Sequence, residues 1–429
     1  MKKLVLSPEQ RQVFDLIENS QDHVFVTGRA GTGKSTLLTY LAWNTKKSLV
    51  VSAPTGVAAL NVGGQTLHSL FRLPIGVIAD HELEQSPELR KLLNALDTLV
   101  IDEVSMVNAD LMDAIDRSLR QARQRPEEPF GGVQTVLFGD PYQLAPVPGD
   151  NDERAYFADT YRSMWFFDAK VWEKTELHRV ELVMVHRQHE AEFRFMLNAV
   201  RHGQVTREIA DRLNTVGARP APHDGTITLA TRNDTVARIN ARELAELPGR
   251  ALTAKAEVTG DFGGRNYPAD EELELKVGSR VMFLRNDVSQ GDGPRWVNGT
   301  MGTVTRIDST VFVDVDGQTH EVEPAIWEKY KYGYSPETKK LTKDVIGEFT
   351  QFPLRLAWAV TIHKSQGKTY DQAIVDLGTR TFATGQTYVA LSRITTLSGL
   401  YLTRPLRPSD ISVDADVERF MRQATTVTT

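Results

Sequence analysis

Short apolar segments, bounded by polar residues, glycine or proline, recur along the first 180 residues. They occupy residues 23–27, 48–53, 98–101 and 133–138, and their continuous apolar character is typical of strands buried on both faces. Between them, residues 108–123 carry apolar side chains four positions apart, which predicts an amphipathic helix. Strands that alternate with helices predict one doubly wound α/β domain with a parallel sheet over residues 1–180.

The second half of the chain repeats this α/β pattern. Its buried-strand signals lie in residues 181–188, 226–233, 353–367 and 373–377. We therefore expect a second doubly wound domain, built from residues 181–250 and 351–429.

A region of different character separates the two parts of this second domain. From about residue 250 to 350 the helical periodicity disappears, and residues 310–315 alternate between apolar and polar side chains. Asp316-Gly317 then marks a tight hairpin before residues 318–322. With further strand signals at 280–284 and 300–307, this pattern predicts a small inserted β-barrel over residues 251–350.

A helix is predicted to begin near the N-terminus. Ser7 has the features of an N-cap, Pro8 suits the first helical position, and Gln10 stands where its side chain completes a capping box. Gln10 also precedes the glycine-rich loop described below, and a carboxamide can both donate to and accept from an adenine edge. From the residues alone, both roles of Gln10 stay open.

The composition is that of a globular chain, with 429 residues of which 41% are hydrophobic and 25% charged. This length predicts roughly two to four domains. No apolar run reaches the roughly 20 residues of a membrane helix, and no secretory signal is recognisable, so we expect a cytoplasmic protein, nucleoid-associated in a prokaryote. The absence of cysteine excludes disulfides, thiolate zinc sites and iron–sulfur clusters.

The charge distribution changes this picture locally. A net charge of −6 argues against a protein that coats nucleic acid by bulk electrostatics. Residues 329–343 nevertheless contain five lysines, among them Lys339 and Lys340, against the single acid Glu337. Tyrosines interleave with these lysines, which suits a strand whose bases stack on rings while its phosphates meet ammonium groups. A solvated loop is the alternative.

Residues 28–35 match the phosphate-loop spacing G-x-x-x-x-G-K-[ST] between a predicted strand and a predicted helix. Backbone N–H groups and the helix N-terminus would face the phosphates, Lys34 would neutralise the β- and γ-phosphates, and Ser35 would ligate Mg²⁺. The expected nucleotide-binding residues here are Gly28, Ala30, Gly31, Thr32, Gly33, Lys34, Ser35 and Thr36. A glycine-rich turn without a ligand is the less favoured alternative.

Two further strand ends carry candidate catalytic groups. Asp102 and Glu103 follow the strand at 98–101, where Asp102 would hold Mg²⁺ and Glu103 would orient or deprotonate the attacking water. Gln143 follows the strand at 133–138 and could report on the γ-phosphate, or it could be an ordinary turn residue.

Small polar residues follow other strands, and two arginines stand apart. Segments 54–56 and 66–71 suit contact with a phosphodiester backbone, although alone they would be only loop and cap residues. Arg187 and Arg393 are candidates to reach the γ-phosphate, because a rigid fork of donors suits spread negative charge. Each arginine could instead form a surface salt bridge.

Together these motifs resemble superfamily 1B DNA helicases of the PIF (petite integration frequency) type along nearly the whole chain. In chain order they are Gln10, the phosphate loop, residues 53–56, Asp102-Glu103, Gly139-Asp140 with Gln143, His186-Arg187, residues 363–367 and residues 390–393. The segment from Asp110 to the Pro-Phe-Gly-Gly turn at 129–132 is similar to the signature that separates this group from its relatives.

The resemblance implies two RecA-like domains of the P-loop NTPase class that close on ATP and Mg²⁺. Gln10 would hydrogen-bond to adenine, and Gly367 would also contact the nucleotide. Gln143 would sense the γ-phosphate, and Arg187 and Arg393 would be arginine fingers that contact the γ-phosphate. A monomer would move 5′ to 3′ on single-stranded DNA and unwind 5′-tailed or structured duplexes, with other replication or repair proteins as candidate partners. Residues 70–95 would house a strand-separating wedge, and the barrel would embrace DNA.

The residues expected along the DNA path are Pro54, Thr55, Gly56, Thr66, His68, Phe71, Arg232, Asn233, Lys339, Lys340, Thr361 and His363. Two departures limit the resemblance: Pro141-Tyr142 stands where the group often has two aromatics, and the chain has almost nothing outside the motor. The competing hypotheses are a nucleotide-dependent switch that binds a protein through the barrel, and a plain single-strand-binding module.

Overall fold

The computed structural model forms two compact units. It describes residues 5–74, 76–79, 83, 85–146, 151–184, 190–222, 226–262, 267–287, 295–335, 337–338, 340–381, 383–422 and 424–426. The first unit comprises Met1–His186, Lys329–Ile346 and Asp414–Thr429, and the second comprises Arg187–Glu328 and Gly347–Val413. In the described part of the chain, no helix is long and apolar enough to cross a membrane.

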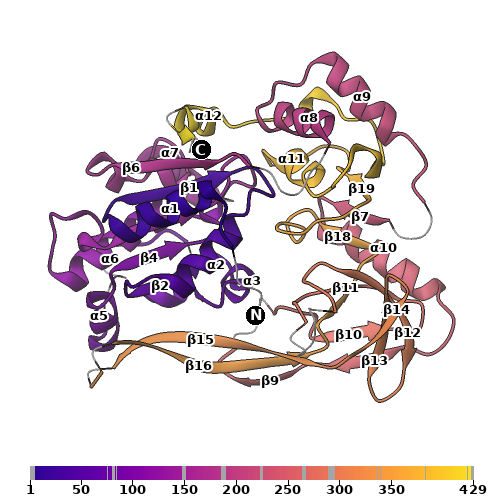
Figure 1. Ribbon diagram of the computed structural model, residues 1–429, viewed down its shortest axis with the longest axis horizontal. Helices are drawn as coiled ribbons and strands as arrows, with labels where there is room; N and C mark the ends of the chain where they lie inside the picture. The colour runs from indigo at the N-terminus through magenta and orange to yellow at the C-terminus, as the bar shows by residue number, and fades with distance from the viewer. Residues whose placement is uncertain are drawn as a thin grey trace. The chain divides into compact units, whose positions relative to one another are not determined.

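The first unit is built on a seven-stranded sheet with the order β21-β6-β1-β5-β4-β2-β3 (Figure 1). Its strands are β1 (His23–Gly28), β2 (Leu49–Ala53), β3 (Gln65–Thr66), β4 (Thr98–Ile101), β5 (Gln134–Phe138), β6 (Leu177–Leu182) and β21 (Thr425–Thr426). Every pair in this sheet is parallel, so the predicted doubly wound architecture is confirmed.

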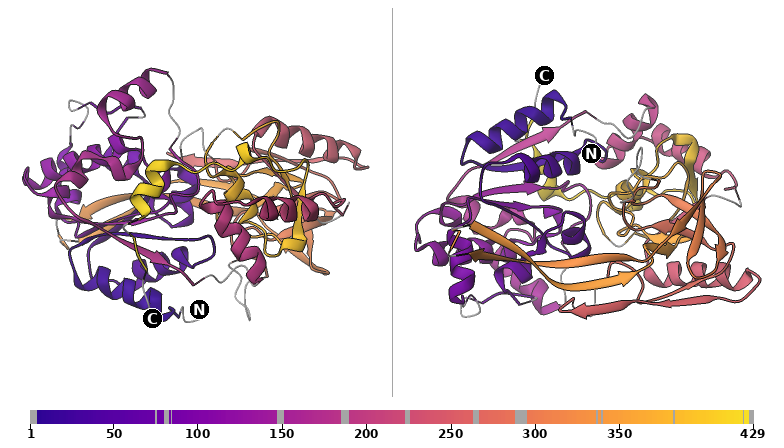
Figure 2. Two further views of the ribbon diagram at one scale, coloured as in Figure 1. Left: turned by 90° about the horizontal axis from the view of Figure 1, so that it is seen from above. Right: turned by 60° about the horizontal axis from the view of Figure 1, so that its bottom comes forward.

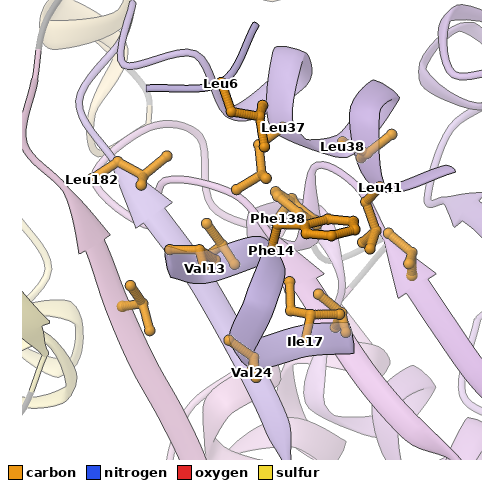
Figure 3. Close-up of a cluster of buried hydrophobic side chains, with 14 of the residues drawn as sticks. Leu6, Val13, Phe14, Ile17, Val24, Leu37, Leu38, Leu41, Phe138 and Leu182 are labelled. Carbon is orange, nitrogen blue, oxygen red and sulfur yellow. The ribbon is translucent and has the colours of Figure 1, made fainter. Parts of the chain in front are cut away.

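Alternate side chains of β1 pack into separate layers on the two faces of this sheet. Val24 and Val26 join an apolar cluster with residues of α1 (Pro8–Asn19) and α2 (Lys34–Asn44), shown in Figure 3. Phe25 points the other way, and its ring centroid lies 5.4 Å from that of Phe166 and 5.4 Å from that of Phe420. The sheet is therefore covered on both faces, as its continuous apolar strands predict.

The helices of the first unit connect these strands. They are α1, α2, α3 (Gly56–Asn61), α4 (Leu67–Phe71), α5 (Pro87–Asn94), α6 (Ala109–Arg123), α7 (Asn151–Thr160) and α12 (Ala415–Met421). The predicted helix at 108–123 is confirmed as α6, and Asn108 caps it by accepting a hydrogen bond from Leu111 N at 2.8 Å.

Three buried carboxylates on α6 fasten other segments to it. Asp110, Asp113 and Asp116 stand at three-residue intervals and are at most 7% exposed. Asp110 accepts from Ile78 N at 2.8 Å, and Asp113 accepts from Val171 N at 3.0 Å. Because each carboxylate satisfies backbone donors outside the helix, α6 fixes the course of these segments.

Asp116 secures the turn at Pro129–Gly132. Its carboxylate accepts a hydrogen bond from Phe130 N at 2.6 Å. Arg120 Nε donates to both oxygens of the same carboxylate, each at 2.8 Å. Phe130 itself has φ 50° and is fully buried, a backbone conformation that a bulky residue adopts only when its surroundings hold it.

The second unit contains a parallel sheet of order β18-β7-β19-β20. Its strands are β7 (Ile227–Ala230), β18 (Ala359–Thr361), β19 (Ala373–Asp376) and β20 (Leu400–Leu402), and its helices are α8 (Ala191–Arg201), α9 (Arg207–Gly217), α10 (Asn233–Glu246) and α11 (Gln386–Leu391). This second α/β part matches the expected fold class. The segment at 181–188, expected to begin it, instead contributes Glu181 and Leu182 to β6 of the first sheet.

The same unit carries an all-β part. A five-stranded antiparallel sheet has the order β14-β13-β12-β11-β17, and a separate pair joins β10 to β8. The strands are β8 (Leu252–Lys255), β10 (Glu272–Leu275), β11 (Arg280–Phe283), β12 (Met301–Ile307), β13 (Val311–Val315), β14 (Gln318–Val322) and β17 (Leu354–Leu356). Asp316 and Gly317 have φ 51° and 83°, which confirms the predicted tight hairpin.

Two long strands, β15 (Ala325–Ser335) and β16 (Lys340–Gln351), run beside each other (Figure 1, Figure 2). They form a sheet with β9 (Glu257–Gly260). We call residues 329–346 the basic arm; by contacts it belongs to the first unit. The domain boundaries expected from the sequence stay a prediction.

We expect replacement of Asp116 by alanine to loosen the turn at Pro129–Gly132, because the buried Phe130 N–H would lose its acceptor. An unsatisfied buried donor costs about 1–3 kcal/mol, so hydrogen exchange of the Phe130 amide should accelerate about tenfold or more. Exchange measured by mass spectrometry over residues 125–133 tests this. Asp211→Ala, which breaks only the exposed pair with Arg207, is the control and should change nothing there. Unchanged exchange in Asp116→Ala would contradict the assigned role.

Candidate nucleotide and nucleic-acid site

Parallel pairing brings the candidate groups of the first unit to one edge of its sheet. The strands that precede the phosphate loop, Asp102-Glu103 and Gln143 are β1, β4 and β5, and they are neighbours in the order β1-β5-β4. Strand β2, which precedes Thr55, and strand β3, which ends at Thr66, continue the same order. The sheet thus arranges the nucleotide candidates and the DNA candidates of this unit side by side along its carboxyl edge.

The phosphate loop is closely packed. A Cβ on Gly28 would lie 2.6 Å from Leu182 O and 2.7 Å from Thr32 Oγ1, so only glycine fits there. Lys34 Nζ donates to Gly28 O at 2.5 Å and to Arg29 O at 3.3 Å. The ammonium group therefore lies over the loop from which α2 begins, where a phosphate group would meet it.

Gln10 makes contacts to both its own helix and the loop. Its Oε1 accepts from Ser7 N at 3.0 Å while its backbone N donates to Ser7 Oγ at 3.2 Å, which confirms the predicted capping box. Its Nε2 donates to Gly33 O at 3.1 Å, and a Cβ on Gly33 would clash with that amide at 2.4 Å. The side chain is thus held against the phosphate loop, and the capping role and a place beside a nucleotide are compatible.

The neighbouring Glu9 was not singled out by the sequence. It is 1% exposed, and Glu9 Oε1 accepts from Val183 N at 2.6 Å just beyond the end of β6. A helix-start glutamate is ordinarily a solvated first-turn residue, so no local signal could have identified this bond.

Asp102 and Glu103 follow β4 in an unusual conformation. Glu103 has φ 50° and ψ 41°, a left-handed conformation that is costly for a non-glycine residue and concentrated at functional sites. Burial and the adjacent Glu103 carboxylate raise the pKa of Asp102, while Lys34 opposes the shift. The Lys34 ammonium of the phosphate loop thus favours the charged form of Asp102.

Ser35 and Asp102 fit a magnesium site. Ser35 is exposed in the first turn of α2, and the unfavourable burial of the Asp102 charge is what a divalent cation would relieve. Among the residues described, no group of three or more His, Asp or Glu side chains could hold a metal alone. Mg²⁺ commonly takes one or two protein ligands together with substrate phosphates, so a sparse set is the expected kind.

Gln143 is held by the strand end that carries it. Its Nε2 donates to Asp140 Oδ2 at 3.2 Å, its backbone N donates to Asp140 O at 2.9 Å, and it is 8% exposed. Asp140 thereby fixes the carboxamide at the end of β5, between β1 and β4.

The hydroxyl groups of the DNA candidates in the first unit serve as helix caps. Thr55 Oγ1 accepts from Ala58 N at 3.3 Å, and Thr66 Oγ1 accepts from Ser69 N at 3.2 Å. The prediction that these residues cap helices is thus confirmed. The N-termini of α3 and α4 therefore begin at the carboxyl edge of the first sheet. Pro54 and Gly56 are partly exposed beside Thr55.

The aromatic and imidazole candidates differ from expectation. Phe71 is 2% exposed, because it closes α4 onto the core, so its ring is not available to stack on a base and that expectation is corrected. Burial lowers the pKa of His68. His68 would therefore meet a phosphate group as a neutral hydrogen-bond donor.

The basic arm contacts the first unit at its edge strand β3. Tyr332 N donates to Gln65 Oε1 at 3.2 Å, and Lys343 Nζ bonds to Gly63 O. The Lys343 ammonium also lies 4.0 Å from the centre of the Tyr330 ring. The basic, aromatic character of the arm is evident in the sequence, but these contacts are not, because they join residues more than 260 positions apart.

The second unit groups its DNA candidates on two adjacent strands. Thr361 on β18 pairs with Ala230 on β7, and Arg232 and Asn233 are exposed just beyond β7. Thr361 Oγ1 accepts from Lys364 N at 3.2 Å. Burial lowers the pKa of His363, which would also act as a neutral group.

Arg393, the candidate arginine that the structure describes, is buried and hydrogen-bonded. Arg393 is 1% exposed, and its guanidinium donates to Val389 O at 3.0 Å and Ser392 Oγ at 2.8 Å. Gly367 is exposed. Arg187 and Lys339 lie outside the described residues, as does the side chain of Lys340.

A cluster of cations beside His363 escaped sequence analysis. Burial and then Arg355 lower the pKa of Lys364, and the same two causes lower the pKa of Lys368 to about 8. Asp270 is the nearby acid, with its Oδ1 3.8 Å from Arg355 Nε. Positive charge is thus concentrated around the loop after β18, although no local run of basic residues marks it.

The two contacts of Gln10 can be separated by Gln10→Glu, because glutamate keeps the capping acceptor but lacks the amide donor to Gly33 O. We expect an unchanged thermal unfolding midpoint and nucleotide binding weakened about tenfold, the cost of one hydrogen bond to a buried carbonyl. Fluorescence titration with labelled ATP and GTP measures this. Equal losses of affinity for ATP and GTP would show that Gln10 stabilises the phosphate loop. A loss of affinity for ATP alone would show that Gln10 contacts the adenine edge. Unaltered affinity for both nucleotides would refute both roles.

The comparisons with known proteins agree with this geometry. The family model of the PIF1-like helicases matches residues 5–211. The human ATP-dependent DNA helicase PIF1 is 35% identical over 412 residues, which cover 92% of this chain and 60% of that protein. The Bdellovibrio bacteriovorus ATP-dependent DNA helicase Pif1 is 33% identical over 431 residues, which cover 98% of this chain and 92% of the relative.

Solved structures are similar over nearly all of the chain. Bacteroides sp Pif1 in complex with ADP-AlF4 has a TM-score of 0.90 and 39% identity, and the alignment covers 98% of this chain and 97% of that one. Bacteroides Pif1 bound to single-stranded DNA has a TM-score of 0.70 and 40% identity with the same coverage. The predicted fold class and resemblance are therefore confirmed, and the chain belongs to the PIF1-like helicase family.

Proposed function

We propose that this chain is an ATP-dependent DNA helicase that moves 5′ to 3′ on single-stranded DNA and unwinds 5′-tailed or structured duplexes. The observation that carries the proposal is the sheet order β1-β5-β4-β2-β3, which joins a phosphate loop and its carboxylates to a row of capped helix N-termini. Relatives named ATP-dependent DNA helicases support it, as do the Bacteroides Pif1 structures with ADP-AlF4 and with single-stranded DNA.

The nucleotide half of the site supplies charge and orientation. When nucleotide binds, Lys34 would leave the carbonyl oxygens of Gly28 and Arg29 and bond to the β- and γ-phosphates. A hydrogen bond from an ammonium group to a charged phosphate is stronger than one to a neutral carbonyl. Ser35 and Asp102 would hold Mg²⁺, which when bound neutralises phosphate charge. We assign Gln143, whose carboxamide donates to Asp140 Oδ2, the role of sensing the γ-phosphate.

Glu103 orients or deprotonates the attacking water. Its left-handed backbone is a strained conformation, which persists only where the surroundings enforce it. Positioning of water by a carboxylate is the usual demand of phosphoryl transfer to water, where little covalent chemistry is left to the protein.

We assign Arg187 and Arg393 the role of stabilising charge on the transferred phosphoryl group, as the family resemblance implies. A planar fork of donors suits that charge, and Arg393 already uses its donors on Val389 O and Ser392 Oγ. Engagement of Arg393 would therefore replace neutral acceptors by phosphate oxygens, which couples nucleotide binding to a local rearrangement around α11.

We assign the DNA strand to the helix N-termini after β2 and β3 and to the segments after β7 and β18. Thr55, Gly56 and Thr66 suit phosphate contact through N–H groups, and Arg232 with Asn233 adds exposed donors. Neutral His68 and His363 contribute hydrogen bonds rather than charge, which suits a motor that must release its strand.

We further infer a monomer that works in the cytoplasm, on the nucleoid in a prokaryote, with replication or repair proteins as partners. A nucleotide-dependent protein switch and a plain single-strand-binding module are the competing functions. Measuring ATP hydrolysis with and without single-stranded DNA separates all three, since only a motor should be strongly stimulated. Unwinding of 5′-tailed but not 3′-tailed duplexes then tests the polarity, and the reverse preference would contradict it.

Glu103→Gln is expected to keep nucleotide affinity within about twofold, since the carboxamide preserves size, while DNA-stimulated hydrolysis falls about 10² to 10⁴-fold with loss of the base. Steady-state turnover, with fluorescent nucleotide binding alongside, makes the measurement. Glu208→Gln, in the exposed first turn of α9, is the matched control and should behave as the unmodified protein. Retained turnover in Glu103→Gln would remove Glu103 from its role.

A further inference from the structure

A cavity of about 620 Å³ lies in the all-β part of the second unit, apart from every group considered so far. It opens between the five-stranded sheet and the start of β15, and its wall includes Trp296, Arg295, Pro324 and Ile326. This volume is in the range of pockets that bind small ligands or a few side chains of a peptide.

The base of the cavity is aromatic and rigid. The Trp296 ring stacks on Phe283 at a centroid distance of 4.3 Å, and Arg295 lies 4.3 Å from the centre of the Trp296 ring. Asp287 accepts from two donors of the Arg295 guanidinium, Nε and Nη2, each 3.0 Å from a carboxylate oxygen, and Nη1 donates to Glu321 O at 3.3 Å. The charge of Arg295 is therefore compensated within the wall, and it is not available to an anion.

The rim is acidic and apolar. Glu321 and Glu323 flank the buried Val322, so both point to the solvent face, and neither has an ion-pair partner within 4.0 Å among the described residues. Pro324 and Ile326 are exposed next to them, Ile326 by 49%. The rim thus places exposed aliphatic side chains beside solvent-facing carboxylates that interact electrostatically with Arg295.

Trp296 provides a second sign of a ligand. The residue is 6% exposed, and its indole Nε1 has no hydrogen-bond acceptor in the described part of the protein. A buried N–H without an acceptor costs free energy, which an incoming carbonyl oxygen would recover after a small opening of the cavity.

Charge decides the class of ligand. Four acidic side chains and two arginines line the cavity, so the wall repels phosphodiester groups and attracts cations. We propose that this cavity docks an extended basic segment of a partner protein, in which an arginine or lysine meets Glu321 and Glu323 and a neighbouring proline or leucine covers Ile326. A main-chain carbonyl of the segment accepts from Trp296 Nε1. The proposal is independent of helicase activity, because no residue of the nucleotide or DNA site lines the cavity.

Fluorescence anisotropy with the full chain, in the absence of DNA, tests the proposal. The probe is a fluorescein-labelled dodecapeptide of three Arg-Pro-Leu-Pro repeats, compared with the same peptide in which glutamate replaces arginine. We expect the basic peptide alone to bind, with a dissociation constant of about 100 μM or tighter. Glu321→Lys with Glu323→Lys should weaken it about tenfold or more, since two attractions become repulsions. Trp296→Phe keeps the stack on Phe283 but removes the donor, so a loss of about fivefold is expected.

The matched control is Glu271→Lys with Glu274→Lys, two exposed glutamates of the same unit that lie outside the cavity. It changes the net charge equally and should leave peptide binding unchanged, and circular dichroism of all variants verifies that they fold. Absence of binding by the basic peptide, equal binding of the acidic one, equal losses in the control, or full binding in the Glu321/Glu323 variant would each overturn the proposal.

Discussion

Parallel pairing of the seven strands is the constraint on which the first unit depends. A parallel strand must be followed by a crossover, so every strand ends at the same edge and every following loop begins there. The phosphate loop, Asp102-Glu103 and Gln143 are consequently neighbours although 115 residues separate Gly28 from Gln143. The same constraint brings the capped starts of α3 and α4 to that edge, so that they share one support, the parallel sheet, with the phosphate loop and the carboxylate pair.

Buried polar side chains hold this support in shape. Gln10 and Glu9 tie α1 to the phosphate loop and to the end of β6, and the three aspartates of α6 fasten the segments around it. Each of these bonds satisfies a backbone donor or acceptor, which makes the local course of the chain specific rather than merely compact. A site that must discriminate the states of a phosphate group needs such fixed positions, because small displacements weaken hydrogen bonds steeply.

The groups proposed to contact DNA have the opposite character. Burial favours the neutral forms of His68 and His363, and Thr55 and Thr66 are uncharged. A protein with net charge −6 thus confines positive potential to particular loops. Weak, local attraction of this kind is compatible with a strand that is gripped and released, and it leaves the acidic cavity of the all-β part to other partners.

The sequence by itself determined the buried strands β1, β2, β4 and β5, the phosphate loop, the carboxylate pair, the hairpin at Asp316-Gly317 and the family, because these depend on residue type and short spacing. Only the tertiary structure decided that Gln10 both caps α1 and reaches Gly33, that Phe71 is buried, and that the basic arm belongs with the first unit. The bond between Glu9 and Val183 spans 174 residues. Burial and long-range partners of this kind arise from how elements pack, and no local periodicity encodes them.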